Sequence, residues 1–362
     1  MNIACYITGH GFGHATRTLQ VLRHIQKLHT GTRFLIKTTV PEWLVKEAGP
    51  ADSTYIFQDN GPGITQVDAL SFDPAQTLRA CMDFLDRKED ILHSEVSFLK
   101  ASLVDVVISD IPAFPFAAAA RVGIPGYGIA NFSWDWIYEE FLSTHKAFRC
   151  VINDLQTDYK QCTRLFKLPF SARMAIFPQQ HQTPLVCRQS ALQPSQIRQR
   201  FGLSTERPVA LLSFGGISLQ HTDWGQIGKN LNVQILCSEI ANHASQTLIQ
   251  INRHSLQDAG LGYHDLVKAA DVCITKPGYG IVAECLANHT RMIFTDRGNF
   301  REYGYLQPAI LEHLSGIFVS NEEVIRGKVN SALEASLSKP LPPLPFPANG
   351  AEVIAQYIVS QN

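Results

Sequence analysis

Residues 3–28 read IACYITGHGFGHATRTLQVLRHIQKL. The apolar run at residues 3–7 predicts a buried β-strand, and three glycines follow at alternate positions from residue 9 to residue 13. Beyond them, apolar side chains recur at spacings of three and four, at Ala15, Leu19, Leu22, Ile25 and Leu28. This spacing places them on one face of a helix. A strand, a glycine turn and a helix in this order are typical of a β-α unit in a parallel sheet.

The same alternation of apolar runs and helical patterns continues along the chain in two series. Strands of the first series are predicted at residues 3–8, 34–37, 55–57, 104–109 and 125–129, and a long amphipathic helical stretch at about 75–103. Strands of the second series are predicted at residues 208–214, 233–237, 272–275, 292–295 and 317–320. Two series of β-α units predict an α/β fold with two doubly wound domains.

A polar segment at about 177–194 is the best candidate for a linker between the two series. The sequence KPLPPLPFP at residues 339–347 must be extended, because each proline removes a backbone donor and biases the preceding residue away from helix. An amphipathic helix is predicted at about 350–360. We therefore expect an N-terminal domain at residues 1–180, a second domain at 181–345 and a helical C-terminal segment at 346–362.

The chain has 362 residues, with 31 Lys and Arg against 32 Asp and Glu, a net charge of −1. This balance disfavours binding of nucleic acid or of an anionic membrane surface. The eight cysteines form no C-x-x-C pair and are interpreted as reduced core thiols. Neither a secretion signal nor an apolar run of membrane-spanning length is read in the sequence. We expect a protein without a transmembrane segment, most simply in the cytoplasm.

The glycine loop at residues 9–14 lets a ligand approach the backbone, and the helix N-terminus beside it favours an anion. Its G-x-G-x-G spacing, and a second strand that ends Lys37-Thr38-Thr39 without a carboxylate, disfavour a dinucleotide-dependent dehydrogenase. The glycines between His10 and His14, and the lack of a third ligand nearby in the sequence, disfavour a metal site. We interpret both histidines as catalytic or substrate-binding residues, with loop capping as the alternative.

Two strand-to-helix junctions of the second series also contain glycines. Gly215-Gly216 follows one apolar strand, and Lys276-Pro277-Gly278-Tyr279-Gly280 follows another and opens a helix with Glu284 in its first turns. The amides of residues 278–280 suit a diphosphate, and Glu284 suits the two hydroxyls of a ribose. The alternative is a buried tight turn in which Glu284 favours the helix dipole. A polar cluster at residues 296–303 follows the next strand, where open parallel sheets bind ligands.

Several of these motifs together resemble a known family. They are GHGFGH at residues 9–14, Ser109-Asp110, NFSWD at 131–135, KPGYG at 276–280 with AEC at 283–285, and Arg297-Gly298. They resemble the glycosyltransferase-like N-terminal domain of plant-type arabinokinases and, more distantly, glycosyltransferase family 28. The resemblance extends over nearly the whole chain. The sugar-kinase half of arabinokinases has no counterpart in these residues, so kinase activity is not implied.

The resemblance implies the GT-B fold, in which two Rossmann-like domains face a central cleft and a C-terminal helix crosses back to the N-terminal domain. It implies a glycosyltransferase that takes a nucleotide sugar, most simply a UDP-sugar, and an unidentified acceptor hydroxyl, with no further cofactor. Donor contacts are expected from Gly215, Gly216, Tyr263, His264, Lys276, Gly278, Tyr279, Gly280, Glu284 and Arg297. Acceptor contacts are expected from His10, Gly11, Phe12, Asn131, Ser133, Trp134 and Asp135. For the last group the alternative is a helix capped by Asn131 or Ser133, with Trp134 in the core.

A glycosyl transfer needs a base for the acceptor hydroxyl and positive charge for the departing diphosphate. The chain has no D-x-D triplet, so we expect a metal-independent reaction in which helix N-termini, Lys276 and Arg297 stabilise the diphosphate, with Arg17 as a weaker candidate. His14 is the expected base, because an ordinary imidazole accepts a proton near neutral pH. Asp110 is either the alternative base or the residue that orients His14. A direct displacement with one base predicts inversion at the anomeric carbon.

Two other functions fit the same fold. A sugar-nucleotide 2-epimerase would need carboxylates around the donor sugar, and Asp110, Asp135 and Glu302 are the candidates. A non-catalytic nucleotide-sugar-binding module would have lost the base or the diphosphate contacts, which are present in this sequence. Incubation with a nucleotide sugar and no acceptor separates the enzymes, because only an epimerase converts the sugar.

Overall fold

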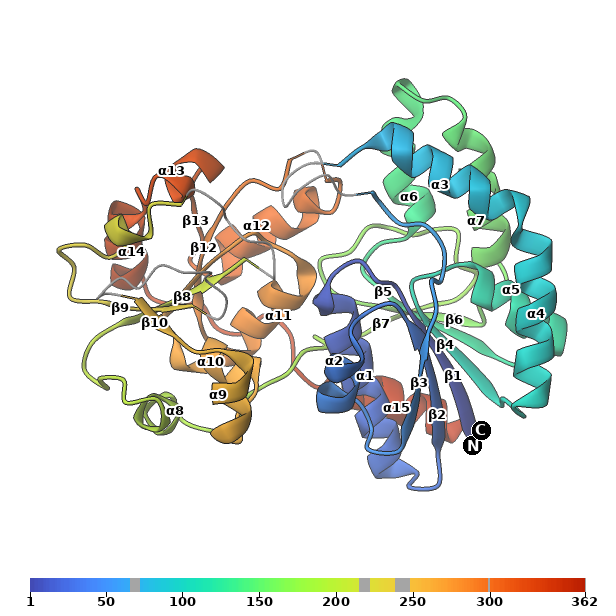
Figure 1. Ribbon diagram of the computed structural model, residues 1–362, viewed down its shortest axis with the longest axis horizontal. Coiled ribbons are helices and arrows are strands. Elements are labelled where there is room, and N and C mark those ends of the chain that lie inside the picture. The colour runs from blue at the N-terminus through green and yellow to red at the C-terminus, as the bar shows by residue number, and fades with distance from the viewer. Residues whose placement is uncertain (66–71, 215–221, 238–247, 299, 362) are drawn as a thin grey trace. The chain divides into compact units, whose positions relative to one another are not determined.

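The computed structural model describes residues 1–65, 72–214, 222–298 without 238–247, and 300–361 (Figure 1). They divide into two compact units. Unit 1 comprises Met1–Cys187, Phe300–Glu302 and Pro347–Asn362, and unit 2 comprises Arg188–Asn299 and Tyr303–Phe346. The short segment at residues 300–302 thus packs with unit 1, although the chain on both sides of it belongs to unit 2.

A parallel sheet in the order β3-β2-β1-β4-β5-β6-β7 forms the centre of unit 1. Its central strands read as continuous apolar runs because helices cover both faces of the sheet. In register, Ile3 of β1 lies opposite Phe34 of β2 on one side and Val106 of β4 on the other. The strands are β1 (Asn2–Ile7), β2 (Arg33–Thr38), β3 (Ser53–Phe57), β4 (Val106–Asp110), β5 (Gly126–Ala130), β6 (Arg164–Lys167) and β7 (Gln180–Gln182).

The helices of unit 1 flank this sheet. They are α1 (Phe12–Leu28), α2 (Glu42–Ala48), α3 (Pro74–Asp86), α4 (Lys88–Ala101), α5 (Phe114–Val122), α6 (Trp134–Tyr138), the 3-10 turn η1 (Glu139–Ser143), α7 (Phe148–Tyr159) and α15 (Gly350–Ser360). The stripe predicted on α1 is buried at Leu19, Leu22 and Ile25, whereas Leu28 at its end is 49% exposed. α15 packs against α1, so the first and last helices of the chain lie side by side (Figure 1).

Unit 2 contains a second parallel sheet, in the order β10-β9-β8-β11-β12-β13. Its strands are β8 (Val209–Ser213), β9 (Gln234–Cys237), β10 (Leu248–Gln250), β11 (Val272–Thr275), β12 (Arg291–Phe294) and β13 (Ile317–Phe318). Its helices are α8 (Pro194–Arg200), the 3-10 turn η2 (Trp224–Gln226), α9 (Arg253–Asp258), α10 (Tyr263–Ala269), α11 (Tyr279–Asn288), α12 (Tyr303–His313), α13 (Asn321–Ile325) and α14 (Asn330–Ser338). β8 and β11 pair in the middle of this sheet, with Ala210 opposite Val272.

All ten predicted strands are present, and three others were missed. β7 consists of the polar residues QHQ within the expected linker. β6 (RLFK) and β10 (LIQ) contain only two apolar residues each, which is too few to show the apolar pattern that identifies a strand. The single helix expected at 75–103 is two helices, because the backbone departs from helical geometry at Arg87. All eight cysteines are free and seven are buried, but Cys150 is exposed, which corrects the prediction of core thiols there. None of the helices in the described ranges is long and apolar enough to cross a membrane.

Candidate functional site

The loop between β1 and α1 brings the glycine motif to the carboxyl edge of the first sheet. Gly11 precedes α1 with a φ of +86°, a backbone conformation that side chains with a Cβ rarely adopt. The next residue, Phe12, is 40% exposed and meets Trp43 edge to face, with 5.7 Å between the ring centroids. The expected acceptor-side loop therefore presents Phe12 to solvent, packed against the half-buried Trp43.

His10 turns inward from this loop. Its Nε2 lies 3.2 Å from the carbonyl oxygen of Ile64, and its Nδ1 lies 2.8 Å from the hydroxyl of Thr8. A carbonyl only accepts, so Nε2 holds the proton and Nδ1 accepts from Thr8. Burial, and to a smaller extent the nearby His14, lower the pKa of His10 to about 4. His10 is therefore a neutral histidine whose two ring nitrogens are both engaged, which matches the loop-capping alternative.

The lowered pKa makes His10 a source of acid sensitivity. Above pH 6.5 it is neutral in both states, but below that value the unfolded chain binds a proton that the folded chain resists. Stability is thus expected to fall as the pH drops from 6.5 towards 4, by up to about 3 kcal/mol from this residue. Urea unfolding of the wild type and His10→Asn at several pH values tests this. The difference between their unfolding free energies should shrink as the pH falls, and a constant difference would contradict it.

His14, at the first turn of α1, contacts Asp110 at the end of β4. Its Nδ1 lies 2.8 Å from Asp110 Oδ1, and its side chain is 12% exposed. Arg17, one turn later on α1, donates to both carboxylate oxygens of Asp110, from Nε at 2.7 Å and from Nη2 at 2.6 Å. Thr18 donates to Asp110 Oδ2 at 2.6 Å. The spacing of the helix thus brings three side chains of α1 onto one buried carboxylate.

These contacts affect the charge of Asp110 and the position of the proton on His14. Burial alone would raise the pKa of Asp110, but the charges of Arg17 and His14 outweigh it and hold that pKa well below its usual range. An ionised carboxylate cannot donate, so Nδ1, 2.8 Å from Asp110 Oδ1 and 3.1 Å from Arg17 Nη2, is the nitrogen that bears a proton towards Asp110. When the ring is neutral, its lone pair is then on Nε2. No described residue makes a hydrogen bond to that Nε2. Asp110 is fully buried and accepts hydrogen bonds on both carboxylate oxygens.

Arg17 and Asn131 are part of the same network. Arg17 Nη1 donates to Asn131 Oδ1 at 2.7 Å, and Asn131 Nδ2 donates to Glu302 Oε1 at 2.6 Å. Arg17 is 3% exposed and Asn131 is 1% exposed. The guanidinium of Arg17, the weaker candidate for binding the diphosphate, therefore donates to Asp110 and Asn131 of unit 1. Asn131 lies directly after β5.

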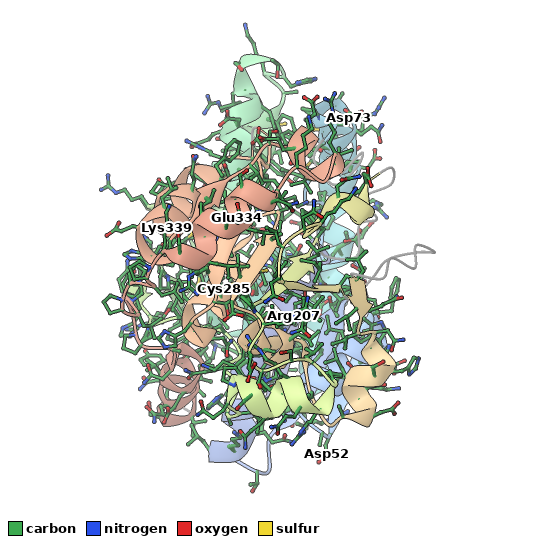
Figure 2. All side chains as sticks on the ribbon, turned by 90° about the vertical axis from the view of Figure 1, so that its left-hand side faces the viewer. Asp52, Asp73, Arg207, Cys285, Glu334 and Lys339 are labelled. Atoms are coloured by element: carbon green, nitrogen blue, oxygen red, sulfur yellow. The ribbon has the colours of Figure 1, made fainter. Side chains whose placement is uncertain are left out.

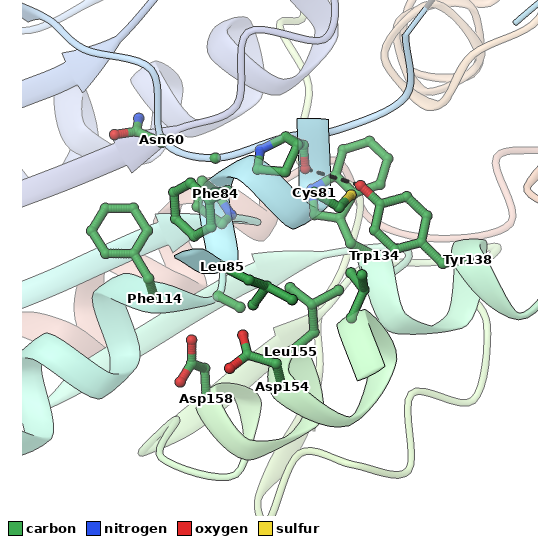
Figure 3. A pocket seen from close by; sticks show the side chains of 15 residues that line it. Asn60, Cys81, Phe84, Leu85, Phe114, Trp134, Tyr138, Asp154, Leu155 and Asp158 are labelled. Atoms are coloured by element: carbon green, nitrogen blue, oxygen red, sulfur yellow. Dashed lines mark hydrogen bonds between the residues drawn. The ribbon is translucent and has the colours of Figure 1, made fainter. Parts of the chain in front are cut away.

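The other residues expected on the acceptor side lie in the core of unit 1. Trp134 is 4% exposed, stacks on Tyr138, and meets Phe132 and His10 edge to face. Trp134 and Tyr138 line a cavity of about 30 Å³ (Figure 3). Ser133 precedes α6 without a side-chain capping bond, and Asp135 is buried, which raises its pKa. The core alternative thus describes Trp134 better than an acceptor contact does.

In unit 2, hydrogen bonds join the ends of β8 and β11 to each other and β8 to the start of α10, at the edge where donor contacts are expected. The hydroxyl of Tyr263, at the start of α10, donates to Ser213 Oγ at 2.6 Å, and Thr275 Oγ1 donates to the carbonyl of Ser213 at 2.5 Å. The half-buried His264 folds back over Gly262, where an added Cβ would lie 2.7 Å from its ring. Tyr263 and His264 therefore lie at the carboxyl edge of β8 and β11. Gly215 and Gly216, also expected there, lie outside the described residues.

The junction between β11 and α11 has the features of an anion site. Gly278 caps α11 with extended backbone, Tyr279 is buried, and Gly280 and Lys276 are half-buried. Arg297, from the loop after β12, lies over the same helix end, because its Nη1 is 3.7 Å from where a Cβ on Gly278 would be. A helix N-terminus has unpaired amide groups and a partial positive charge, to which this guanidinium adds.

Glu284 lies further along α11 and has a partner that the sequence did not indicate. Arg188 donates from Nε to Glu284 Oε1 at 2.7 Å, with side-chain exposures of 18% for the arginine and 7% for the glutamate. The place of Glu284 on α11 can be found in Figure 2 from the label of Cys285, the next residue in the chain. Arg188 lies in the polar segment expected as a linker, 96 residues away, so no local pattern could have identified it. In the part of the chain described, His, Cys, Asp and Glu side chains form no group of three that could hold a metal ion.

Comparison with known proteins places this geometry in context. No model of a protein family matches the chain. The chain is 29% identical over 359 residues to the L-arabinokinase of Arabidopsis thaliana, a match that covers 98% of this chain and 34% of that protein. The chain thus spans about a third of the length of this curated relative.

Solved structures of glycosyltransferases have the same fold. The glycosyltransferase VinC, solved in complex with DTDP, superposes with a TM-score of 0.59 at 13% identity, over 100% of this chain and 95% of that chain. The calicheamicin glycosyltransferase CalG4 gives 0.59 at 15% identity, over 99% and 94%. A UDP-glucosyltransferase from Polygonum tinctorium gives 0.62 at 10% identity, over 99% and 92%. The chain therefore has a GT-B glycosyltransferase-like fold, which confirms the resemblance read from the sequence.

Proposed function

We propose that this protein transfers a glycosyl group from a nucleotide sugar, most simply a UDP-sugar, to an acceptor hydroxyl. The observation that supports this most directly is the contact between His14 and Asp110. It provides an imidazole whose Nε2 lone pair is available and whose orientation is held by a buried, ionised carboxylate. Such a pair is suited to removing a proton from a hydroxyl as it attacks.

The donor is proposed to bind at the carboxyl edge of the second sheet. The diphosphate would accept from the amides at the start of α11 while Arg297 and Lys276 offset its charge, and Glu284 would accept from the ribose hydroxyls. These groups supply the charge stabilisation that the leaving diphosphate needs without a metal ion. With His14 as the only base in a direct displacement, the product has the inverted anomeric configuration.

Thermal shifts with UDP, GDP, ADP, CMP, dTDP and their common sugars test the donor site. A ligand that binds only the folded state raises stability by RT ln(1 + [L]/Kd), so one nucleotide should raise the Tm selectively. Glu284→Ala should abolish that shift, because it removes the acceptor for two hydroxyls. Glu334→Ala, on an exposed position of α14, is the matched control and should retain it. A well-folded sample that shifts with none of these ligands would contradict a nucleotide-sugar function.

No observation favours a 2-epimerase over a transferase. The three carboxylates that an epimerase would need around the donor sugar are all buried, with exposures of 0% at Asp110, 5% at Asp135 and 4% at Glu302. Asp110 and Glu302 are also engaged with partners in unit 1. Incubation of the protein with its donor nucleotide sugar and no acceptor should leave the sugar unepimerised.

A further inference from the structure

Arg188 and Glu284 form a largely buried ion pair on α11, the helix whose start is proposed to bind the diphosphate. The guanidinium occupies one oxygen of the carboxylate, Oε1, at 2.7 Å. No described residue donates to the other oxygen, Oε2. A carboxylate that is only 7% exposed is costly to keep charged without a partner, and Arg188 provides that partner. The pair therefore keeps a charged acceptor at this position and leaves Oε2 for another donor.

The backbone that bears Arg188 is also fixed to α11. Asn288, one helical turn after Glu284, donates from Nδ2 to the carbonyl of Arg188 at 3.1 Å and to the carbonyl of Glu284 at 2.9 Å. Its Oδ1 accepts from the amide of Ser190 at 2.9 Å, and Gln189 Nε2 donates to the carbonyl of Ala287 at 3.0 Å. Residues 188–190 are thus bonded along the last turns of α11. Arg188 is consequently held at Glu284 rather than reaching it as a mobile surface side chain.

We propose that Arg188 is a positioning residue that orients Glu284 towards ribose hydroxyls, so that this protein prefers ribonucleotide donors to their 2′-deoxy counterparts. The inference rests on the proposed function of Glu284. Each carboxylate oxygen accepts two hydrogen bonds, so Oε2 and the remaining lone pair of Oε1 face the diol while Arg188 fixes the plane of the group. The positive charge of Arg188 also offsets the negative charge of Glu284, which would otherwise repel an anionic nucleotide.

The test compares ribonucleoside diphosphates with their 2′-deoxy counterparts, as the pairs UDP and dUDP, GDP and dGDP, and ADP and dADP. Affinities are measured by calorimetry on the wild type, Arg188→Met and Arg188→Lys. The wild type should bind the ribonucleotide of one pair roughly 10- to 100-fold more tightly, the value of one or two charge-assisted hydrogen bonds. Arg188→Met should bind that ribonucleotide about as weakly as the deoxynucleotide. Arg188→Lys retains the positive charge but not the planar guanidinium with its several donors, so it should retain part of the preference for the ribonucleotide.

Arg198→Met is the matched control. Arg198 forms another ion pair in unit 2, with its Nη2 at 2.7 Å from Asp271 Oδ2 and side-chain exposures of 9% and 34%, but Asp271 precedes β11 and so lies at the opposite edge of the sheet. This variant should lower the Tm and leave the ratio of ribonucleotide to deoxynucleotide affinity unchanged. The inference would be overturned if Arg188→Met and Arg188→Lys had the same ratio of ribonucleotide to deoxynucleotide affinity as the wild type, or if either variant bound the ribonucleotide more tightly than the wild type does. If the wild type binds no nucleotide of the panel, the proposed function fails instead.

Discussion

His14→Ala is expected to lower the turnover number of the proposed transferase reaction by roughly 10²- to 10⁴-fold, the usual contribution of a positioned general base. The loss is expected in turnover rather than in donor affinity, because the donor groups lie in unit 2. The fold should be retained, because no hydrogen bond reaches Nε2 from the described residues and Asp110 keeps its contacts with Arg17 and Thr18. Turnover with the identified donor and acceptor, measured beside circular dichroism and Tm, checks this prediction.

Two controls make the result specific. His29→Ala changes the histidine that follows α1 at its other end, where the ring forms a hydrogen bond with Thr32, and should retain full turnover. Added imidazole should restore part of the activity of His14→Ala, since it can occupy the space left and accept the proton. Asp110→Asn is expected to lower both turnover and stability, because Arg17 would lose its counter-charge inside the core. Full turnover in His14→Ala would exclude it as the base.

The largest expected effect on stability lies elsewhere in unit 1, in a buried cluster around Glu95. Glu95 Oε1 accepts from the hydroxyl of Tyr6 at 2.5 Å and from Lys37 Nζ at 2.6 Å, and Gln58 Nε2 lies 3.3 Å from Oε2. Lys37 is 3% exposed and Glu95 is 4% exposed. Burial lowers the pKa of Lys37, and the carboxylate of Glu95 opposes that shift. The charge of Lys37 therefore depends on this single glutamate and on the face of Phe98, 3.5 Å from Nζ to ring centroid.

Glu95→Leu should lower the free energy of unfolding by about 3–5 kcal/mol, because it leaves a buried ammonium group and a buried hydroxyl without their acceptor. The triple variant Tyr6→Phe, Lys37→Met, Glu95→Leu should recover most of this loss, since the buried ammonium group and hydroxyl are removed with their acceptor, and the half-buried Gln58 keeps Asn60 Oδ1 as a partner at 3.4 Å. Urea unfolding of the three proteins measures both changes. A triple variant as unstable as the single one would show that the loss comes from packing rather than from an unpaired charge.

The order of strands and helices was largely readable from the sequence because it depends on local periodicity. The apolar run at residues 3–7, the glycines after it and the stripe on α1 all lie within one β-α unit, so their meaning does not depend on distant contacts. Two of the three strands that were missed, β7 and β10, are edge strands. An edge strand pairs on one side only, so it needs no apolar pattern of its own.

The candidate site was predictable to a smaller extent. The sequence predicted glycine loops directly after strands, and Glu284 in the helix that follows one of these loops. This is the edge at which parallel sheets bind ligands. From the sequence alone, Asp110 could be either the base or the residue that orients the base, and Trp134 could either contact the acceptor or pack in the core. In the structure Asp110 is saturated by donors and Trp134 packs among aromatic rings, because burial and hydrogen bonding depend on which helices cover the sheet.

The sequence by itself therefore determined that this is an α/β chain with glycine turns at the ends of its parallel strands, since each of these features is encoded within a few consecutive residues. Only the tertiary structure decided which side chains act together. His14 meets Asp110, and Arg188 meets Glu284, each across 96 residues of chain. Such pairs form when strand order and helix packing bring distant residues within about 3 Å, a distance that hydrogen bonds require and that no local pattern specifies.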